Sequence, residues 1–515
     1  MSRDNAERLR GFALYPVLTA VYAAVRVAAG NAFDVTLSEL AAVIAVCTLA
    51  AFIVDALLFA TLKGRVPSSA IALLATLAIA WLFNAEPFAD SGLLIGLRSR
   101  DALIVLSLFT IALVLWLLRT RRDLHAASRT ARIVAIALPL LATGEFIAKR
   151  VAIHRAVNSS RFLARATRPL PLPSHAPPHP KRDVYLLILD QYGSADVLAE
   201  SYGFDNQPFL DSLAALGLTV TRSSHSNYGW TPLSLGSMLS GEHVRAMEAD
   251  ADTRRAPWEV LYSLIKRSPV LAAYKRAGYQ VFLTRSASFT ATQSSEVAEA
   301  YLPSDSRSPL LRLARLGLAR AVLQGTVVGR LVEKTGRSWM PEAIQLAPFT
   351  GTIELLKRPG PKLVFAHSLV SHEPFVFDSE CRPTRRLPEE TSMYPDQVRC
   401  TNRQVIRTVR AIEIQDPDAV IVVMADHGPM IPGIAGGAIA EAITRAQATA
   451  RFGAIRATRL PNGMTLPDST TPVNVIRRVV AVTLGIDLPD VADSSYWSTL
   501  DAVDHFVAVD SLLSR

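Results

Sequence analysis

The sequence predicts a chain in two parts, an N-terminal α-helical transmembrane bundle and a C-terminal α/β domain with a mostly parallel central sheet. Half of the 515 residues are hydrophobic and only 19% are charged, and the longest apolar runs lie within residues 1–149. After residue 182, short apolar runs alternate with helical patterns, which is typical of a parallel sheet covered by helices.

Five apolar stretches within residues 1–149 approach the ~20 residues that a helix needs to cross a bilayer. They cover residues 11–30, 39–62, 69–85, 102–118 and 132–148. The third and fifth are short, so four spans is the alternative count. We interpret the first as an anchor rather than a cleavable signal peptide, because more spans follow it and no small-residue cleavage site stands out.

Basic residues predict the orientation of these spans. Arginines and lysines gather in residues 3–10, 63–65 and 119–132, and such segments stay in the cytoplasm. Five spans therefore place everything after residue 150 outside the cytoplasm. The same topology accounts for much of the net charge of +9, so the charge does not indicate nucleic acid. Asp55 and Glu145 lie near span ends, which favours snorkelling or local pairing over a functional role.

Residues 150–182 change in character and predict a linker. The segment 169–180 is rich in proline, which is typical of an extended, semi-rigid spacer. The third region, residues 183–515, is predicted to be the extracytoplasmic domain. Within it, residues 308–335 form a basic amphipathic stretch that lies on the membrane surface or packs on its own domain.

Four continuous apolar runs predict strands that are buried on both faces. They are Val184–Leu189, Gly278–Leu283, Lys362–Ala366 and Ala419–Met424. Ligands collect at the C-terminal ends of the strands in sheets of this kind. Three of the runs end in residues with suitable chemistry, namely Asp190, the pair His367 and His372, and the pair Asp426 and His427.

Thr231 precedes Pro232 and an apolar stretch, a pattern that predicts a helix beginning at this point. Threonine is a good N-cap, and proline is favoured at the first helical position. The N-terminus of a helix attracts anions, so a hydroxyl there is placed to lose its proton to a metal and attack phosphorus. From the local sequence alone, a plain N-cap is the other interpretation.

Asp426, His427 and Gly428 close the last apolar run. At a strand-to-loop turn, both an aspartate and the histidine after it can reach one ion, and Gly428 would permit the turn. Two carboxylates, an imidazole and a hydroxyl form an oxygen and nitrogen ligand set that suits zinc or manganese.

Two further pairs of residues have possible roles. His367 and His372 are five residues apart at a predicted strand end, where imidazoles can hold substrate oxygens or protonate a leaving group. A structural role is the alternative. Cys381 and Cys400 lie in a polar stretch, and an oxidising compartment would allow them to form a disulfide. We predict that they do.

Taken in order, these motifs resemble one family. A strand followed by Asp190 comes first, then Asn227-Tyr-Gly-Trp-Thr231, then His367-x4-His372-x-Pro-Phe, and finally Asp426-His427-Gly. This order is similar to that of the membrane-anchored sulfatase-like hydrolases and transferases of the alkaline phosphatase superfamily. Lipoteichoic acid synthases and lipid A phosphoethanolamine transferases are better-known members. The resemblance covers roughly residues 183–500 and the multi-span N-terminal architecture.

The resemblance implies an alkaline-phosphatase-like domain, a mechanism and a ligand set. Thr231 would be the nucleophile and would form a phosphothreonine intermediate, and His367 and His372 would bind substrate. The implied ligands of a divalent metal are Asp190, Thr231, Asp426 and His427.

The chain departs from this pattern at three points. The two named transferase groups have Glu where this chain has Asp190. The Cys/Ser-x-Pro-x-Arg signature of sulfatases is absent around Thr231, which argues against sulfate-ester hydrolysis. Phosphoethanolamine transferases carry a further His shortly after the Asp-His-Gly motif, whereas the only later His here is His505.

The predicted function is transfer of a phosphoryl-type substituent from a membrane phospholipid to an envelope glycan or lipid, because a lipid donor must be met at the bilayer. The alternative is a sulfatase-like hydrolase, a phosphodiesterase or phosphatase acting on an extracytoplasmic substrate. A non-catalytic envelope protein is a third hypothesis, which the retained set of site residues disfavours. The expected location is the inner (cytoplasmic) membrane, with several spans and a periplasmic or extracellular catalytic domain.

Overall fold

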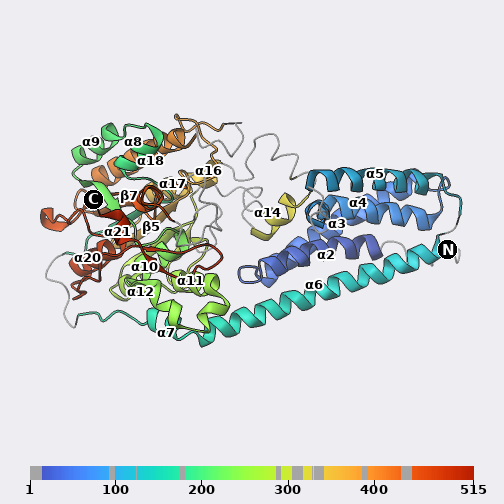
Figure 1. Ribbon diagram of the computed structural model, residues 1–515, viewed down its shortest axis with the longest axis horizontal. Coiled ribbons are helices and arrows are strands. Elements are labelled where there is room, and N and C mark those ends of the chain that lie inside the picture. The colour runs from blue at the N-terminus through green and yellow to red at the C-terminus, as the bar shows by residue number, and fades with distance from the viewer. Residues whose placement is uncertain are drawn as a thin grey trace. The chain divides into compact units, whose positions relative to one another are not determined.

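The computed structural model describes residues 14–91, 99–122, 124–173, 180–285, 292–303, 317–326, 329, 342–384, 393–430 and 443–514. The chain divides into two compact units, one made of residues 1–152 and 309–339 and the other of residues 153–308 and 340–515. The helices of the first unit and the α/β elements of the second are labelled in Figure 1.

Over its described residues, each of the five predicted apolar stretches lies on one helix, which confirms the N-terminal helical region. The helices are α2 (Leu14–Gly30), α3 (Leu37–Leu62), α4 (Ser68–Ser91), α5 (Ser99–Arg119) and α6 (His125–Ser159). By length and composition, α3 and α6 can cross a membrane, while Leu14–Gly30, Ser68–Phe83 and Ile104–Arg119 are apolar but shorter. Glu145 pairs with Lys149 at 2.6 Å, as expected for a carboxylate with a local partner.

The basic stretch of residues 308–335 is described only in part, and that part belongs to the first unit. Helix α14 (Gly317–Gln324) packs against α2 and α3. The Leu318 backbone N–H donates to Glu39 Oε1 at 2.8 Å, so a carboxylate satisfies the first turn of α14. The described part of this stretch therefore packs with helices of the first unit.

Helix extends into the first part of the predicted linker, residues 150–182. Helix α6 ends at Ser159, and α7 (Arg161–Ala166) follows it. Asp250 Oδ2 accepts hydrogen bonds from the Phe162 N–H at 2.8 Å and from Ser160 Oγ at 3.0 Å. These contacts hold the start of α7, so extended chain begins only after this helix.

The second unit is built on a seven-stranded sheet with the strand order β2-β7-β6-β1-β5-β3-β4. The five strands from β6 to β4 are parallel to their neighbours, and β7 is antiparallel to both β6 and β2. A separate two-stranded sheet pairs β8 with β9. The strands are β1 (Val184–Leu189), β2 (Thr219–His225), β3 (Gln280–Thr284), β4 (Glu299–Tyr301), β5 (Lys362–Ser368), β6 (Val420–Ala425), β7 (Gly453–Arg459), β8 (Tyr496–Trp497) and β9 (Val507–Ala508).

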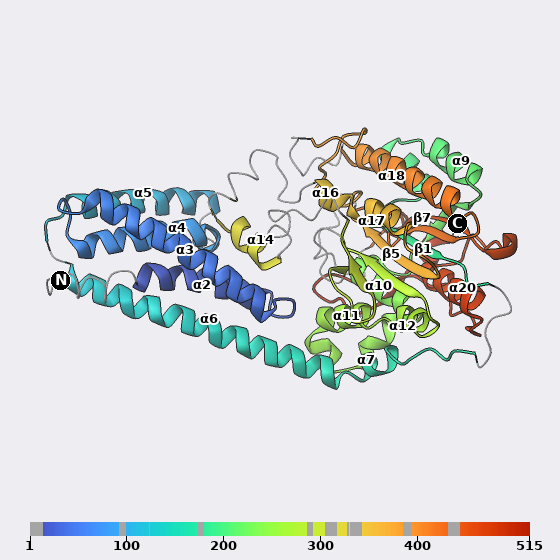
Figure 2. The ribbon, with the colours of Figure 1, turned by 180° about the vertical axis from the view of Figure 1, so that it is seen from behind.

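Helices cover both faces of this sheet (Figure 2). Alternate residues of β1 explain the two cores: Tyr185 and Leu187 pack with α8, α9, α17 and α18, whereas Leu186 and Ile188 pack with α10, α11, α12 and α20. The helices are α8 (Ala195–Tyr202), α9 (Gln207–Ala215), α10 (Thr231–Ser240), α11 (Pro257–Lys266), α12 (Pro269–Arg276), α16 (Glu342–Gln345), α17 (Ala347–Leu355), α18 (Tyr394–Gln415), α19 (Arg445–Phe452), α20 (Pro472–Leu484) and α21 (Asp510–Leu513).

All four predicted strands are present, whereas β2 and β7 were not predicted. Both carry polar residues, and β7 buries Arg456. The Arg456 guanidinium donates to Thr221 Oγ1 at 2.6 Å and to the Thr470 carbonyl at 2.8 Å. Because its hydrogen bonds come from distant segments, local sequence gives no sign that this arginine lies in a sheet.

Cys381 and Cys400 form a disulfide with a Cα–Cα distance of 4.9 Å, which confirms the predicted pairing. The bond joins a loop to helix α18. Replacing both cysteines with serine should lower the free energy of unfolding by about 3 kcal/mol, because the bridge closes a loop of nearly 20 residues. Treating the unmodified protein with a reductant should lower its thermal unfolding midpoint as much as the double substitution does. An unchanged midpoint in the reduced protein would contradict a stabilising role.

Candidate functional site

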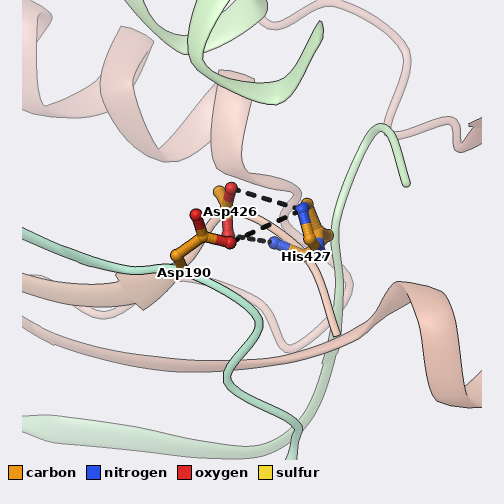
Figure 3. A group of neighbouring side chains, drawn as sticks. All are labelled: Asp190, Asp426 and His427. Atoms are coloured by element: carbon orange, nitrogen blue, oxygen red, sulfur yellow. Dashed lines mark hydrogen bonds and ion pairs between the residues drawn. The ribbon is translucent and has the colours of Figure 1, made fainter. Parts of the chain in front are cut away.

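Strand pairing brings the candidate ligands together at one edge of the sheet. Strand β1 lies between β5 and β6, and its last residue, Leu189, is in register with Ser368 on β5 and Ala425 on β6. Asp190 and Asp426 are therefore the first residues beyond two neighbouring parallel strands. The ligand atoms of Asp190, Asp426 and His427 all lie within 4.8 Å of one another, and all three side chains are buried (Figure 3).

Thr231 reaches the same cluster from a different segment. Helix α10 begins at Thr231 with Trp230 as its N-cap, so the expectation that Thr231 itself is the N-cap is wrong by one residue. Its hydroxyl is thereby free to face the cluster. Thr231 Oγ1 lies 3.0 Å from His427 Nε2 and 3.4 Å from each carboxylate oxygen of Asp190.

The His427 ring is held in one tautomer. Its Nδ1 lies 2.8 Å from the Gly428 carbonyl oxygen, which can only accept a hydrogen bond. Nδ1 therefore carries the proton, and Nε2 presents a lone pair toward Thr231 and the carboxylates. This is the arrangement in which a neutral imidazole binds a metal while its other nitrogen is oriented by a carbonyl.

Asp426 has one oxygen engaged and one without a hydrogen bond. Its Oδ1 accepts from the His427 N–H at 2.8 Å and from the Gln191 N–H at 3.2 Å. Its Oδ2 is buried with no hydrogen-bond partner in the described part of the chain and lies 3.5 Å from His427 Nε2. A buried carboxylate oxygen without a donor is costly, and a cation would satisfy it.

The buried charges strongly perturb the ionisation of the cluster. Burial raises the pKa of Asp190 to about 7, and the nearby Arg451 opposes this shift. Burial and then the charge of Asp190 hold the pKa of Asp426 well above its usual range. Burial and then Arg451 hold the pKa of His427 well below its usual value. Two acidic groups that resist ionisation beside a neutral imidazole form a site that favours an added positive charge.

Two backbone features keep the ligands in place. Gln191, which follows Asp190, has a φ of 56°, a conformation that is costly for a residue other than glycine. It is held there because its carbonyl accepts from Tyr394 Oη at 2.7 Å. A Cβ at Gly428 would lie 2.0 Å from the Ala450 carbonyl oxygen and 2.7 Å from that of Gly453. Glycine is therefore required at residue 428 by close backbone approach.

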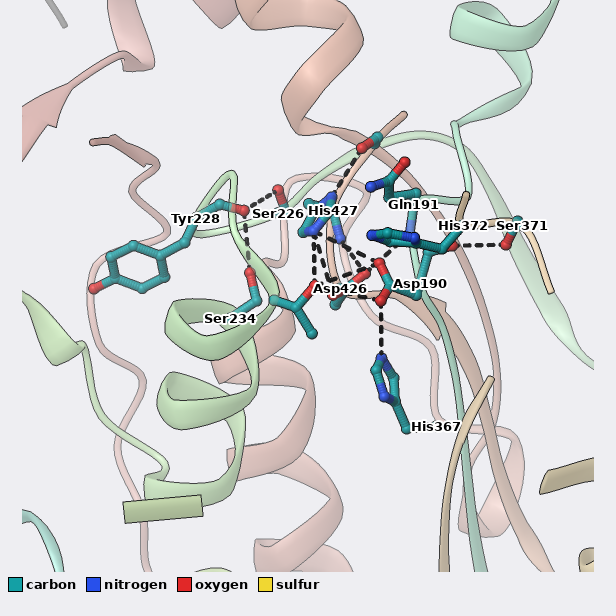
Figure 4. Close-up of polar contacts among 12 residues, drawn as sticks. Asp190, Gln191, Ser226, Tyr228, Ser234, His367, Ser371, His372, Asp426 and His427 are labelled. Atoms are coloured by element: carbon teal, nitrogen blue, oxygen red, sulfur yellow. Dashed lines mark hydrogen bonds and ion pairs between the residues drawn. The ribbon is translucent and has the colours of Figure 1, made fainter. Parts of the chain in front are cut away.

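The two predicted histidines occupy different positions. His367 has no exposed surface, and its Nε2 lies 3.6 Å from Asp190 Oδ2. It lies on the opposite side of Asp190 from His427 (Figure 4). His372 is half-buried, and its Nδ1 lies 2.5 Å from the Glu373 carbonyl oxygen, so its Nε2 carries the lone pair. Burial lowers the pKa of His367 to about 3 and also lowers that of His372.

Arg451 was not predicted from the sequence. It is 1% exposed, and its guanidinium lies 4.5 Å from the centre of the Trp230 ring. Its Nη1 donates a hydrogen bond at 3.2 Å to the Gly428 carbonyl oxygen. The same oxygen accepts the hydrogen bond from His427 Nδ1. Arg451 thus links Trp230, which precedes Thr231, to Gly428, which follows His427. No motif surrounds Arg451 in the sequence, and only the packing of α19 reveals its position.

Two other hydroxyls near the start of α10 are engaged elsewhere. Ser226 Oγ and Ser234 Oγ both donate to the Tyr228 carbonyl oxygen, at 2.9 Å and 3.0 Å (Figure 4). Among the described hydroxyls near the start of α10, Thr231 is the one that contacts the carboxylates and the imidazole.

The sheet and the site define an α/β enzyme with a buried ligand cluster and an adjacent hydroxyl at the C-terminal ends of parallel strands. Residues 182–452 match the sequence pattern of the Sulfatase family, which is more than half of the 515 residues. The chain belongs to this family, and it is an enzyme. Enzymes of this fold use divalent metals.

Several solved structures are similar. The periplasmic domain of EcEptC from Escherichia coli aligns at 14% identity over 67% of this chain and 97% of that chain, with a TM-score of 0.42. The soluble domain of lipooligosaccharide phosphoethanolamine transferase A from Neisseria meningitidis aligns at 14% identity over 59% and 89%, with a TM-score of 0.38. The integral membrane protein of the same name aligns at 13% identity over 91% and 92%, with a TM-score of 0.39. No curated protein matches the sequence.

Gly428→Ala tests how tightly the backbone holds the cluster. The added Cβ meets two backbone carbonyls, so the turn must shift and carry His427 away from Thr231. We expect activity to fall at least about tenfold, because displacement by about 1 Å is enough for a large loss. Gly236→Ala in α10 is the matched control, since its Cβ would make only ordinary contacts of 3.4 Å or more. Equal activity in the two variants would contradict the requirement at residue 428.

Proposed function

We propose that this chain is a metal-dependent phosphotransferase that uses Thr231 as its nucleophile and passes through a phosphothreonine intermediate. One observation carries the proposal. The Thr231 hydroxyl lies within 3.0 Å of the unprotonated nitrogen of His427 and 3.4 Å from both oxygens of Asp190. A hydroxyl in such surroundings is activated as a nucleophile.

The proposed metal ligands fit a divalent cation such as Zn²⁺ or Mn²⁺. Two observations support the fit: Asp426 Oδ2 is buried without a hydrogen bond, and the tautomer of His427 leaves Nε2 free to bind. The ligands would be Asp190, Thr231, Asp426 and His427. When bound, the cation supplies the positive charge that lowers the pKa of the Thr231 hydroxyl and stabilises negative charge on a phosphoryl group.

In the first half-reaction, Thr231 Oγ1 attacks the phosphorus of the donor. A bond forms between Oγ1 and phosphorus, and the bond from phosphorus to the leaving oxygen breaks. Asp190 is placed to take the hydroxyl proton, because both its oxygens are 3.4 Å from Oγ1. The leaving oxygen takes up this proton as it departs.

In the second half-reaction, the hydroxyl of the acceptor gives up its proton and attacks the same phosphorus, the bond from phosphorus to Thr231 Oγ1 breaks, and Oγ1 takes up that proton to restore the hydroxyl. His372 is the proposed base for this step, because it is half-buried, stays neutral and presents a lone pair at Nε2. His367 is a positioning residue in this scheme, because it is fully buried and contacts Asp190 instead of open space.

The cysteine inventory supports phosphoryl chemistry over sulfate-ester hydrolysis. The chain has three cysteines, of which Cys47 lies in α3 while Cys381 and Cys400 are joined in a disulfide. Residue 231 is a threonine, so neither a cysteine nor a serine is available there for conversion to formylglycine.

The proposed donor is a membrane phospholipid, and the proposed acceptor is an envelope glycan or lipid. The apolar N-terminal helices support this choice, since α3 and α6 are long and apolar enough to cross a membrane. We propose a multi-pass protein of the inner membrane whose catalytic domain lies in the periplasm or outside the cell, with a topology set by the basic segments between the spans.

Thr231→Ala tests the nucleophile. Purified full-length protein incubated with candidate phospholipids should gain a covalent adduct in its intact mass, and Thr231→Ala should gain none. The added mass identifies the transferred group, and supplying acceptors or water alone separates transfer from hydrolysis. The variant should remain folded, because Thr231 is not the N-cap of α10.

Ser234→Ala is the matched control, since it removes a hydroxyl from the same helix that bonds only to a carbonyl. It should form the adduct as the unmodified protein does. An adduct on Thr231→Ala, or its loss from a folded Ser234→Ala, would refute the assignment.

The affinity of the cluster for Zn²⁺ or Mn²⁺ should rise with pH. Burial raises the pKa of Asp190 to about 7, so below that pH the metal-free cluster holds a proton that a cation must displace. Binding then releases protons, and affinity increases between about pH 5.5 and about pH 7.5. Titration calorimetry in buffers of different ionisation enthalpy measures both the affinity for the cation and the number of protons released. Affinity that is independent of pH, or that survives Asp426→Ala unchanged, would place the cation elsewhere.

A further inference from the structure

A groove on the second unit lies away from the residues of the ligand cluster. It has a volume of about 860 Å³ and lies between the segment from Gly203 to Ser212 and helix α18. This volume is within the range of ligand pockets, roughly 300–1,000 Å³. Helices α9 and α18, which border the groove, are labelled in Figure 2.

Four arginines of α18 line the groove, namely Arg399, Arg403, Arg407 and Arg410. They extend along about 16 Å of one helix. Two are already paired, Arg399 with Asp396 at 2.9 Å and Arg403 with Glu380 at 2.6 Å. Arg407 and Arg410 are exposed and have no carboxylate partner among the described residues.

These two guanidiniums are placed to hold one anionic group. Residues three apart on a helix are neighbours, with Cβ atoms about 5–6 Å apart. Guanidinium groups bind phosphate through paired, charge-assisted hydrogen bonds. A single phosphate therefore suits Arg407 and Arg410 better than a long row of acidic groups, for which Arg399 and Arg403 would have to leave their present partners.

Apolar side chains surround this pair. Ile406, Ala411 and Ile414 line the groove beside the two arginines, and Phe209 lines it from α9. Ile414 is 78% exposed, so it leaves apolar surface open beside the cationic pair. A ligand with a phosphate and an aliphatic part would contact both kinds of surface.

The groove is joined to the loop that carries Asp190. Asn206 and Asn402 both line the groove and hydrogen-bond to each other at 2.9 Å. Both also bond to the hydroxyl of Tyr192, two residues after Asp190. The floor of the groove is thus continuous, through hydrogen bonds, with the turn that positions a proposed metal ligand.

We propose that this groove binds an anionic phospholipid, with the phosphate held by Arg407 and Arg410 and the start of an acyl chain against Ile406 and Ile414. Charge complementarity and the apolar lining favour this occupant. The proposal concerns binding and does not depend on the reaction at Thr231.

Binding is measured on the purified full-length protein with three soluble probes. Dihexanoyl phosphatidylglycerol should bind at least about tenfold more tightly than dihexanoyl phosphatidylcholine, because two charge-assisted hydrogen-bonding groups face a net negative headgroup. Glycerol 3-phosphate, which has no acyl chain, should bind more weakly than the anionic lipid. A photoreactive phosphatidylglycerol should label residues 203–212 or 399–414.

Arg407→Gln with Arg410→Gln should weaken binding of the anionic lipid about tenfold or more and abolish this labelling. Glutamine is a good helix former, so α18 should persist. Arg254→Gln with Arg358→Gln removes the same charge from exposed arginines outside the groove and should leave binding unchanged. Ile414→Asn should weaken binding of the lipid but not of glycerol 3-phosphate.

Several outcomes would overturn the proposal. The anionic lipid is not the occupant if the two lipids bind equally, or if glycerol 3-phosphate binds as tightly as the anionic lipid. The same holds if substituting the control arginines weakens lipid binding as much as substituting Arg407 and Arg410. Binding of an acidic amphipathic peptide without binding of lipid would assign the groove to a protein partner. Labelling of the groove should persist in Thr231→Ala, so failure of the proposed reaction and failure of this site give different results.

Discussion

Burial of two carboxylates side by side is the constraint on which the site depends. Parallel pairing of β1 with β6 leaves Asp190 and Asp426 as the first residues beyond adjacent strands, where neither has access to water. Burial raises both pKa values, and the charge of Asp190 raises the pKa of Asp426 further, because like charges in a poorly polarisable interior oppose each other's ionisation. The arrangement is favourable only when positive charge is supplied nearby. Arg451 supplies part of it, and a divalent cation would supply the rest.

The surrounding structure serves to hold this arrangement. Gln191 accepts a strained backbone conformation and is held by Tyr394 of α18. Gly428 lets the chain pass against the backbone of residues 450 and 453. Arg451 stacks on Trp230 and bonds to the Gly428 carbonyl. Because these contacts come from separate segments, the distances around Thr231 depend on the whole second unit and not on α10 alone.

The histidines illustrate how burial separates roles that look alike in the sequence. Both lie in one short motif, yet His367 is fully buried against Asp190 while His372 is half-buried. A side chain without exposed surface acts through its neighbour, and a half-buried one can receive a proton from a bound molecule. In the proposed mechanism this difference makes His367 a positioning residue and His372 a base.

The sequence by itself determined the two-part architecture, the five N-terminal helices, four of the buried strands and the disulfide. These depend on local apolar pattern and on residue type, which are visible along the chain. It also identified Asp190, Asp426 and His427 as one group, because strand ends in a parallel sheet converge at one edge, and it added Thr231 as a hydroxyl at a helix start, where anions bind. The metal and the reaction at that group remain proposals.

Only the tertiary structure decided the rest. Strand β7 and the buried Arg456 have polar sequences whose hydrogen bonds come from residues far along the chain. Arg451 is adjacent to the site only because α19 packs beside the turn at Gly428. Helix α7 lies within the region predicted as a linker, and its start is held by Asp250, almost 90 residues away, which accepts hydrogen bonds from the Phe162 N–H and the Ser160 hydroxyl. Local pattern records which faces are apolar, whereas long-range partners of polar groups are set by packing.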